Sequence, residues 1–135
     1  MSLCLPFLSW RPPAGFPSPA DDYDHARLDL NELLIAHPLA TFFFEVSGRS
    51  MEGAGIFDRD LVIVDRAIKP AHGCIVLAQV DNDFTVKYLR LRRGQPELAS
   101  ANPTFPTLRP AEGQQLLVCG VVTAAIKRFT RTRHF

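Results

Sequence analysis

From residue 40 onward, the chain consists of short apolar runs that are separated by turn-forming residues. The runs are rich in β-branched and aromatic side chains, which favour strands because they pack well on a pleated surface. The runs are ATFFFEV (40–46), DLVIVD (60–65), CIVLAQV (74–80), FTVKYLRLR (84–92), QPELAS (95–100) and QLLVCGVVTAAIKRF (115–129). This pattern predicts a mostly β domain built as a curled antiparallel sheet or half-barrel.

Two local signals refine this prediction. Asp81-Asn82-Asp83 lies between two of the runs and is typical of a turn, so these runs are expected to form a hairpin. Gly120 interrupts the long final run and is a candidate for a bulge or a bend.

The segment LDLNELLIAHP (28–38) predicts one short helix. Leu30, Leu33 and Leu34 lie on one helical face, Asp29 or Asn31 can cap the start, and Pro38 cannot continue the helix. A helix-turn-helix DNA-binding motif needs two helices, so none is expected.

The stretch PPAGFPSPADDY (12–23) has proline at four of its first eight positions, around a lone Ala14-Gly15 step. Each proline fixes its own φ and pushes the preceding residue toward extended conformations. Residues 1–28 are therefore predicted to form an extended arm. An extended backbone is also the form in which a protease accepts its substrate.

Composition fits one domain and excludes several classes of protein. The 135 residues are 47% hydrophobic, and the net charge is +1, so no global charge indicates a nucleic-acid or membrane partner.

The basic stretches 89–93 and 127–135 are interpreted as a solvated strand face and terminus, with a polyanion site as the alternative. The three cysteines lack CxxC spacing, so neither zinc nor another metal or cofactor is predicted. No run approaches the ~20 apolar residues of a membrane span, and we expect a cytoplasmic protein.

Ser50 is a candidate nucleophile in SGRSMEGAGI (47–56), a glycine-bearing turn that follows a predicted strand. Such a turn can expose the serine hydroxyl beside backbone N–H groups, which together form a nucleophile and an oxyanion hole. Serine- and glycine-rich turns are also common in proteins without catalytic function. None of the four histidines has a local catalytic signature, so nothing favours a Ser-His-Asp triad.

Lys87 is a candidate base because it lies among apolar residues in the run FTVKYL. Strand alternation puts Thr85, Lys87 and Leu89 on one face. Loss of solvation lowers the pKa of a lysine, and a neutral lysine can accept a serine proton. The alternative is an ordinary strand lysine with its ammonium group in water.

Several blocks together resemble the LexA/UmuD family of self-cleaving Ser-Lys proteases, and its UmuD-type members most closely. The blocks are GFPSPA (15–20), LDLNELLIAHP (28–38), SGRSM (47–51), GI (55–56), DLVIVD (60–65), HGCIVLAQVDNDFTVKYL (72–89) and GVV (120–122). They follow the order of the family, and the spacings of 37 residues from Ser50 to Lys87 and 35 from Gly15 to Ser50 are similar to those of the family.

The resemblance implies a serine endopeptidase that cuts itself. Ser50 matches the nucleophile, Lys87 the general base, and Ala14-Gly15 the scissile bond. The backbone N–H groups of Arg49 and Ser50 match the oxyanion hole. The implied division is an arm with the cleavage site (1–28) and a Ser-Lys peptidase-like β domain of the LexA C-terminal-domain type (29–135).

The resemblance also implies a role and partners. UmuD-type proteins act in SOS mutagenesis, are homodimers, cut themselves when stimulated by the RecA–single-stranded-DNA filament, and then serve an error-prone UmuC-type translesion polymerase. Direct nucleic-acid binding is not expected. The alternatives are a non-cleaving binding module of the same fold, a signal peptidase, and a nucleic-acid-binding module built on the basic tail.

Two positions depart from the family pattern. The cut site is Ala-Gly, as in LexA, where UmuD-type arms usually have Cys-Gly. The DGD turn of the family reads Asp58-Arg59-Asp60 here. If that turn needs a positive φ, arginine costs about 1 kcal/mol of stability there.

Overall fold

A computed structural model of the chain describes residues 2–8 and 26–130. Its internal contacts divide the chain into two units, Met1–Ala36 and His37–Phe135. The predicted boundary after residue 28 remains a prediction. Ala14 and Gly15 lie outside the described residues.

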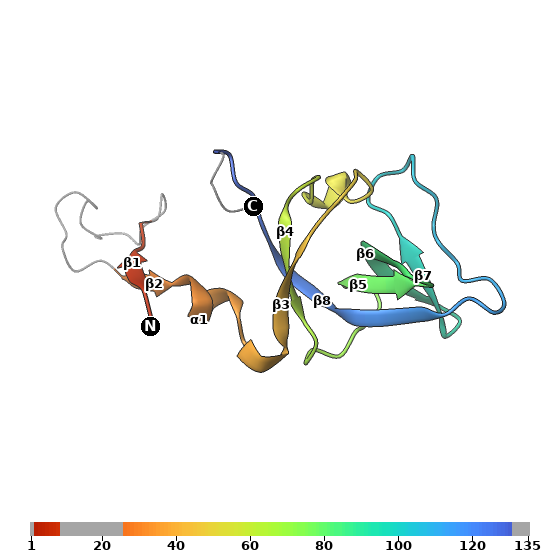
Figure 1. Cartoon of the computed structure of the whole chain (residues 1–135), viewed down its shortest axis with the longest axis horizontal. Helices are drawn as coiled ribbons and strands as arrows, with labels where there is room; N and C mark the ends of the chain where they lie inside the picture. The colour runs from red at the N-terminus through yellow and green to blue at the C-terminus, as the bar shows by residue number, and fades with distance from the viewer. Residues whose placement is uncertain (1, 9–25, 131–135) are drawn as a thin grey trace, which may run out of the picture. The chain divides into compact units, whose positions relative to one another are not determined.

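The first unit contains a small antiparallel strand pair and the one α-helix of the described chain (Figure 1). Strand β1 (Cys4–Pro6) pairs with β2 (Arg27–Asp29), and the Arg27 guanidinium donates a 2.9 Å hydrogen bond to the Cys4 carbonyl. The two ends of the predicted arm are thus paired strands. The sequence did not predict this pairing, because each strand has only three residues.

Helix α1 (Leu30–Leu34) confirms the predicted helix and its cap. The Asp29 carboxylate accepts a 2.9 Å hydrogen bond from the backbone N–H of Asn31, which satisfies one of the free donors at the helix start. The helix ends at Leu34, before Pro38, which instead begins the 3₁₀ helix η1 (Pro38–Ala40).

The second unit is one open antiparallel sheet of six strands (Figure 1). The strands are β3 (Thr41–Glu45), β4 (Leu61–Asp65), β5 (Ile75–Val80), β6 (Asp83–Arg92), β7 (Gln95–Ala99) and β8 (Leu116–Ile126). Their order in the sheet is β3-β4-β8-β5-β6-β7. The last strand in sequence therefore lies between β4 and β5, with the β3–β4 pair on one side and the β5–β6–β7 meander on the other. A mostly β fold with a curled antiparallel sheet is confirmed.

Strand β8 carries two register shifts that bend the sheet. Cys119 is the extra residue opposite the Leu77–Ala78 step, and Thr123 is the extra residue opposite Ile63–Val64. A Cβ on Gly120 would lie 2.6 Å from Val64 Cγ1, so only glycine fits beside the first shift. The predicted irregularity at Gly120 is confirmed.

The turns follow the sequence signals. β5 and β6 form the predicted hairpin, and Asp81 in its turn has a φ of 55°. Arg59 has a φ of 72°, so its turn does require the left-handed conformation.

Two clusters of buried apolar side chains hold the second unit together. One contains Val46, Met51, Ile56, Val62, Val64, Leu77 and Val86, and the other contains Val76, Ala78, Leu89, Leu98 and Val121. Neighbouring residues of β5 alternate between the clusters, as expected for a curled sheet that buries apolar side chains on both faces. In the described part of the chain, no helix is long and apolar enough to cross a membrane.

Candidate active site

Ser50 lies in the turn between β3 and the 3₁₀ helix η2 (Glu52–Ala54). Gly48 enters this turn with a φ of 97°, a conformation that favours glycine, and its N–H donates a 2.7 Å hydrogen bond to the Asp58 carboxylate. Met51 is only 2% exposed, and its carbonyl accepts hydrogen bonds from the N–H groups of Ala54 and Ile56. The residue after Ser50 is therefore anchored in the core.

A second loop, which follows β7, fixes the same turn from outside. The Ser50 carbonyl accepts hydrogen bonds from the N–H groups of Ala101 and Asn102, at 2.9 and 3.0 Å. A Cβ on Gly53 would lie 2.1 Å from the Ala101 carbonyl oxygen, so this approach requires glycine. The Ser50 backbone is thus held by contacts with residues that are about fifty positions away in sequence.

Lys87 projects from β6 onto the Ser50 hydroxyl. Its Nζ donates to Ser50 Oγ at 2.6 Å and to Thr85 Oγ1 at 2.8 Å, with the Val86 carbonyl at 3.4 Å. Thr85 and Lys87 lie two residues apart on the same strand face, as alternation predicted. Three oxygen atoms therefore surround the Lys87 amine, and one of them belongs to the candidate nucleophile.

Burial shifts the pKa of this lysine. Lys87 is 8% exposed, and the loss of solvation lowers the pKa of its amine below the ordinary lysine value. Among the described residues no carboxylate forms an ion pair with Lys87, so no opposite charge counteracts this effect. A neutral amine within hydrogen-bond distance of a serine hydroxyl can act as a general base.

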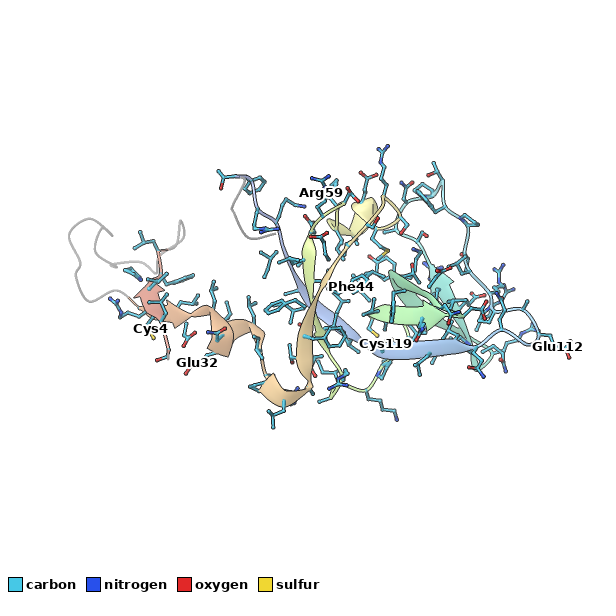
Figure 2. All side chains as sticks on the ribbon, in the orientation of Figure 1. Cys4, Glu32, Phe44, Arg59, Glu112 and Cys119 are labelled. Carbon is cyan, nitrogen blue, oxygen red and sulfur yellow. The ribbon has the colours of Figure 1, made fainter. Side chains whose placement is uncertain are left out.

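A small pocket of about 80 Å³ adjoins Ser50 and Lys87. Phe44, which Figure 2 labels on β3, and Phe84 both line it, with ring centroids 6.2 Å apart. The pocket is lined by Phe44, Val46, Ser47, Ser50, Phe84, Thr85, Val86 and Lys87. A space of this size suits a small side chain next to the hydroxyl.

The structure brings Ser50 and Lys87 together, as the resemblance to the family had implied. Within the described residues, the N–H groups of Arg49 and Ser50 donate no hydrogen bond, so both remain available to an acceptor. Sequence reasoning did not assign a site role to Thr85 or Asn102. The alternation of β6 could have indicated Thr85, whereas nothing local indicated Asn102.

The histidines that the structure describes serve elsewhere. His37 Nδ1 lies 2.6 Å from the Asp65 carboxylate, and His72 Nδ1 accepts a hydrogen bond from the Leu91 N–H. His25 and His134 lie outside the described residues. Among the described residues no cluster of three or more histidine, cysteine or acidic side chains could hold a metal ion.

Comparison with known proteins identifies the family. The pattern of the Peptidase S24-like family matches residues 6–123. The chain belongs to this family. Protein ImpA of Salmonella typhimurium is 49% identical over 133 residues, which cover 98% of this chain and 90% of the relative. Protein SamA of the LT2 strain of that species is 47% identical over 94% of this chain and 88% of its own length.

A more distant Peptidase S24-like relative is the LexA repressor of Azoarcus, 35% identical over 93% of this chain and 62% of the repressor. The resemblance to the UmuD-type members of the LexA/UmuD family is confirmed by these matches, and the fold is consistent with the C-terminal domain of LexA. Serine peptidase activity in general is the chemistry of this family.

Proposed function

We propose that the chain is a self-cleaving serine endopeptidase that cuts its own Ala14-Gly15 bond with a Ser50/Lys87 dyad. The observation that carries the proposal is the 2.6 Å contact between Lys87 Nζ and Ser50 Oγ, made by a lysine that is 8% exposed. Family membership supports the same chemistry.

The reaction begins when neutral Lys87 takes the proton of the Ser50 hydroxyl as Oγ attacks the Ala14 carbonyl carbon. The N–H groups of Arg49 and Ser50 stabilise the oxyanion of the tetrahedral intermediate. The intermediate then breaks its C–N bond, and the Lys87 ammonium gives its proton to the leaving amine of Gly15. Lys87 next deprotonates a water molecule, which hydrolyses the Ser50–Ala14 ester and regenerates both side chains.

Two features around the dyad fit this role. The Thr85 hydroxyl accepts a hydrogen bond from Lys87 Nζ and so helps to hold the amine in place. The pocket of about 80 Å³ beside Ser50 suits the methyl group of Ala14 better than a large side chain.

Tethering of the substrate makes the proposed reaction controllable through the docking of the arm. Because the substrate belongs to the same chain, orientation rather than binding limits the rate. A partner that favours the docked arm would accelerate cleavage by shifting that population. We propose the RecA–single-stranded-DNA filament as this partner, as the resemblance to UmuD-type proteins implies.

The processed product, residues 15–135, would then act in SOS mutagenesis as a homodimeric accessory subunit of a UmuC-like error-prone polymerase in the cytoplasm. Residues 1–14 contain Arg11 as their one charged residue, so cleavage takes the net charge from +1 to 0. Because this change in charge is small, we propose that cleavage changes the activity of the protein by uncovering the surface on which the arm lay.

The test is intact-mass analysis of the purified chain with RecA, ATP analogue and single-stranded DNA, and separately at pH ~10, where more lysine is neutral. Loss of residues 1–14 is expected, and both Ser50→Ala and Lys87→Ala should abolish it. Trp10 is the one tryptophan, so absorbance of the released fragment is a second readout. A chain that stays intact under both conditions would favour a non-cleaving binding module of the same fold.

A further inference from the structure

The Asn102 side chain contacts the turn that carries the proposed nucleophile. Its Nδ2 donates a 3.2 Å hydrogen bond to the Arg49 carbonyl, while its backbone N–H donates to the next carbonyl, that of Ser50, at 3.0 Å. One residue thus holds two consecutive peptide groups on either side of the Ser50 Cα. This residue lies on the loop after β7, far from Ser50 in sequence.

The other end of the amide fixes its orientation. Asn102 Oδ1 accepts hydrogen bonds from the Thr104 N–H at 3.1 Å and from the Thr104 hydroxyl at 2.9 Å. A backbone N–H can only donate, so the oxygen of the amide must face Thr104 and the nitrogen must face Arg49. The contact to the Arg49 carbonyl is therefore a genuine donor–acceptor pair.

The peptide bond between Arg49 and Ser50 links this contact to the proposed oxyanion hole. The Arg49 carbonyl and the Ser50 N–H belong to one planar trans peptide, in which the two groups point in opposite directions. Holding the carbonyl toward Asn102 therefore fixes the direction of the Ser50 N–H. The Arg49 carbonyl also accepts a longer, 3.3 Å bond from the Glu52 N–H, so Asn102 is one of two groups that hold it.

We propose that Asn102 is a positioning residue that orients the Ser50 N–H for the oxyanion of the cleavage reaction. The inference rests on the proposed self-cleavage and deepens it. Preorganised donors are effective because they need no reorientation as charge develops, so a donor that is free to tilt stabilises the oxyanion less. Asn102 has no hydrogen bond to Lys87 or to the Ser50 hydroxyl, so the basicity of the dyad should not depend on it.

The test measures self-cleavage of the full chain without RecA as a function of pH. Asn102→Asp keeps the size of the side chain and its acceptor toward Thr104 but removes the donor toward Arg49. Asn102→Ala removes the donor without adding a charge. Complete loss of one oxyanion donor slows an enzyme by ~100-fold or more, and a misoriented one should cost on the order of 10-fold.

Both variants should therefore lower the plateau rate and leave the melting temperature within a few degrees. Asn102→Ala, which adds no charge, should also leave the pH midpoint at the wild-type value. The matched control is Thr104→Val, which removes the hydroxyl but keeps the Thr104 N–H that decides which end of the Asn102 amide faces Arg49, and it should cleave at the wild-type rate. A moved pH midpoint in Asn102→Ala would mean that Lys87 had been disturbed, which contradicts the proposal.

The outcomes separate the inference from the function on which it rests. If the wild type cleaves and Asn102→Ala cleaves equally fast, the positioning role is wrong and self-cleavage stands. If only Asn102→Asp is slow, the added charge is the cause and the positioning role is again wrong. If the wild type stays intact at every pH and with RecA filament, the proposed function fails and the inference fails with it.

Discussion

Lys87 lies on β6 with little access to water, and this position makes its charged form unfavourable for folding. Charging the amine requires solvation that the site does not supply, so burial lowers the pKa of Lys87. The hydrogen bonds to Ser50 and Thr85 replace part of the lost hydration. The property that makes this lysine a candidate base therefore makes it unfavourable for folding while it carries its proton.

Replacing Lys87 with methionine should stabilise the protein near neutral pH, by on the order of 1 kcal/mol, because a buried charge is exchanged for an apolar group of similar length. At a pH between the lowered pKa of Lys87 in the folded protein and its ordinary pKa in the unfolded chain, the unfolded chain binds more protons than the folded protein. The free energy of unfolding therefore rises with pH in this window, and the destabilising effect of Lys87 becomes smaller. The advantage of methionine should shrink accordingly toward pH ~10.

Urea unfolding of Ser50→Ala and of Ser50→Ala/Lys87→Met measures the effect of Lys87→Met on the free energy of unfolding. The Ser50→Ala change is present in both proteins to prevent self-cleavage during the measurement. A constant difference between pH 7 and pH ~10 would contradict a lowered pKa.

Arg59 is strained by its backbone and not by its contacts. Its φ of 72° falls in the left-handed region, and its side chain reaches outward and is 86% exposed (Figure 2). Arg59→Gly should raise the free energy of unfolding by about 0.5 kcal/mol, because relief of the left-handed strain exceeds the extra entropy that glycine has in the unfolded chain.

Denaturant unfolding checks the effect of Arg59→Gly. The exposed Arg66, which lacks a positive φ, serves as the control, and Arg66→Gly should destabilise the protein. Equal losses in both variants would show that the Arg59 turn carries no strain.

At the scale of elements, the contact between η2 and the loop after β7 depends on a missing Cβ. A Cβ on Gly53 would meet the Ala101 carbonyl oxygen at 2.1 Å, and this oxygen belongs to a loop whose N–H groups hold the Ser50 carbonyl. Gly53→Ala should therefore push the loop away from the turn, lower the free energy of unfolding by about 2 kcal/mol or more, and slow self-cleavage.

Gly94→Ala is the matched control for Gly53→Ala. Gly94 has a φ of 75° in the β6–β7 turn, and a Cβ there meets nothing within 4 Å. It should cost about 1 kcal/mol of backbone strain without changing the cleavage rate. Thermal unfolding and cleavage assays on both variants separate the two effects, and equal cleavage rates would contradict the role given to the η2 contact.

For the whole molecule, both clusters of buried side chains are built from residues of the second unit. A fragment of residues 37–135 should therefore unfold in one cooperative thermal transition, within a few degrees of the full chain carrying Ser50→Ala. Calorimetry of the two proteins makes the comparison. A fragment that lacks a cooperative transition would show that residues 1–36 are needed for the fold.

The strands of the six-stranded sheet were predictable because most are rich in apolar, β-branched or aromatic residues and lie between turn residues, and the helix because Asp29 caps it. The strands β1 and β2 were not predictable, because three residues are too few to show the alternation of a strand. Ser50 and Lys87 are far apart in sequence and were paired only through the ordered resemblance to a family. Asn102 was missed because its role depends on how a loop docks, which no local pattern encodes.

The central position of β8 has a consequence for protein synthesis. Ser50 follows β3 and Lys87 lies on β6, and the sheet joins these two halves through β8, which pairs with β4 on one edge and β5 on the other. While residues 116–126 are still inside the ribosome, the two halves have no strand between them. We therefore expect a nascent chain to be unable to cut its own arm until residues 116–126 have left the ribosome, so the order of the strands itself would delay the proposed self-cleavage until the sheet is complete.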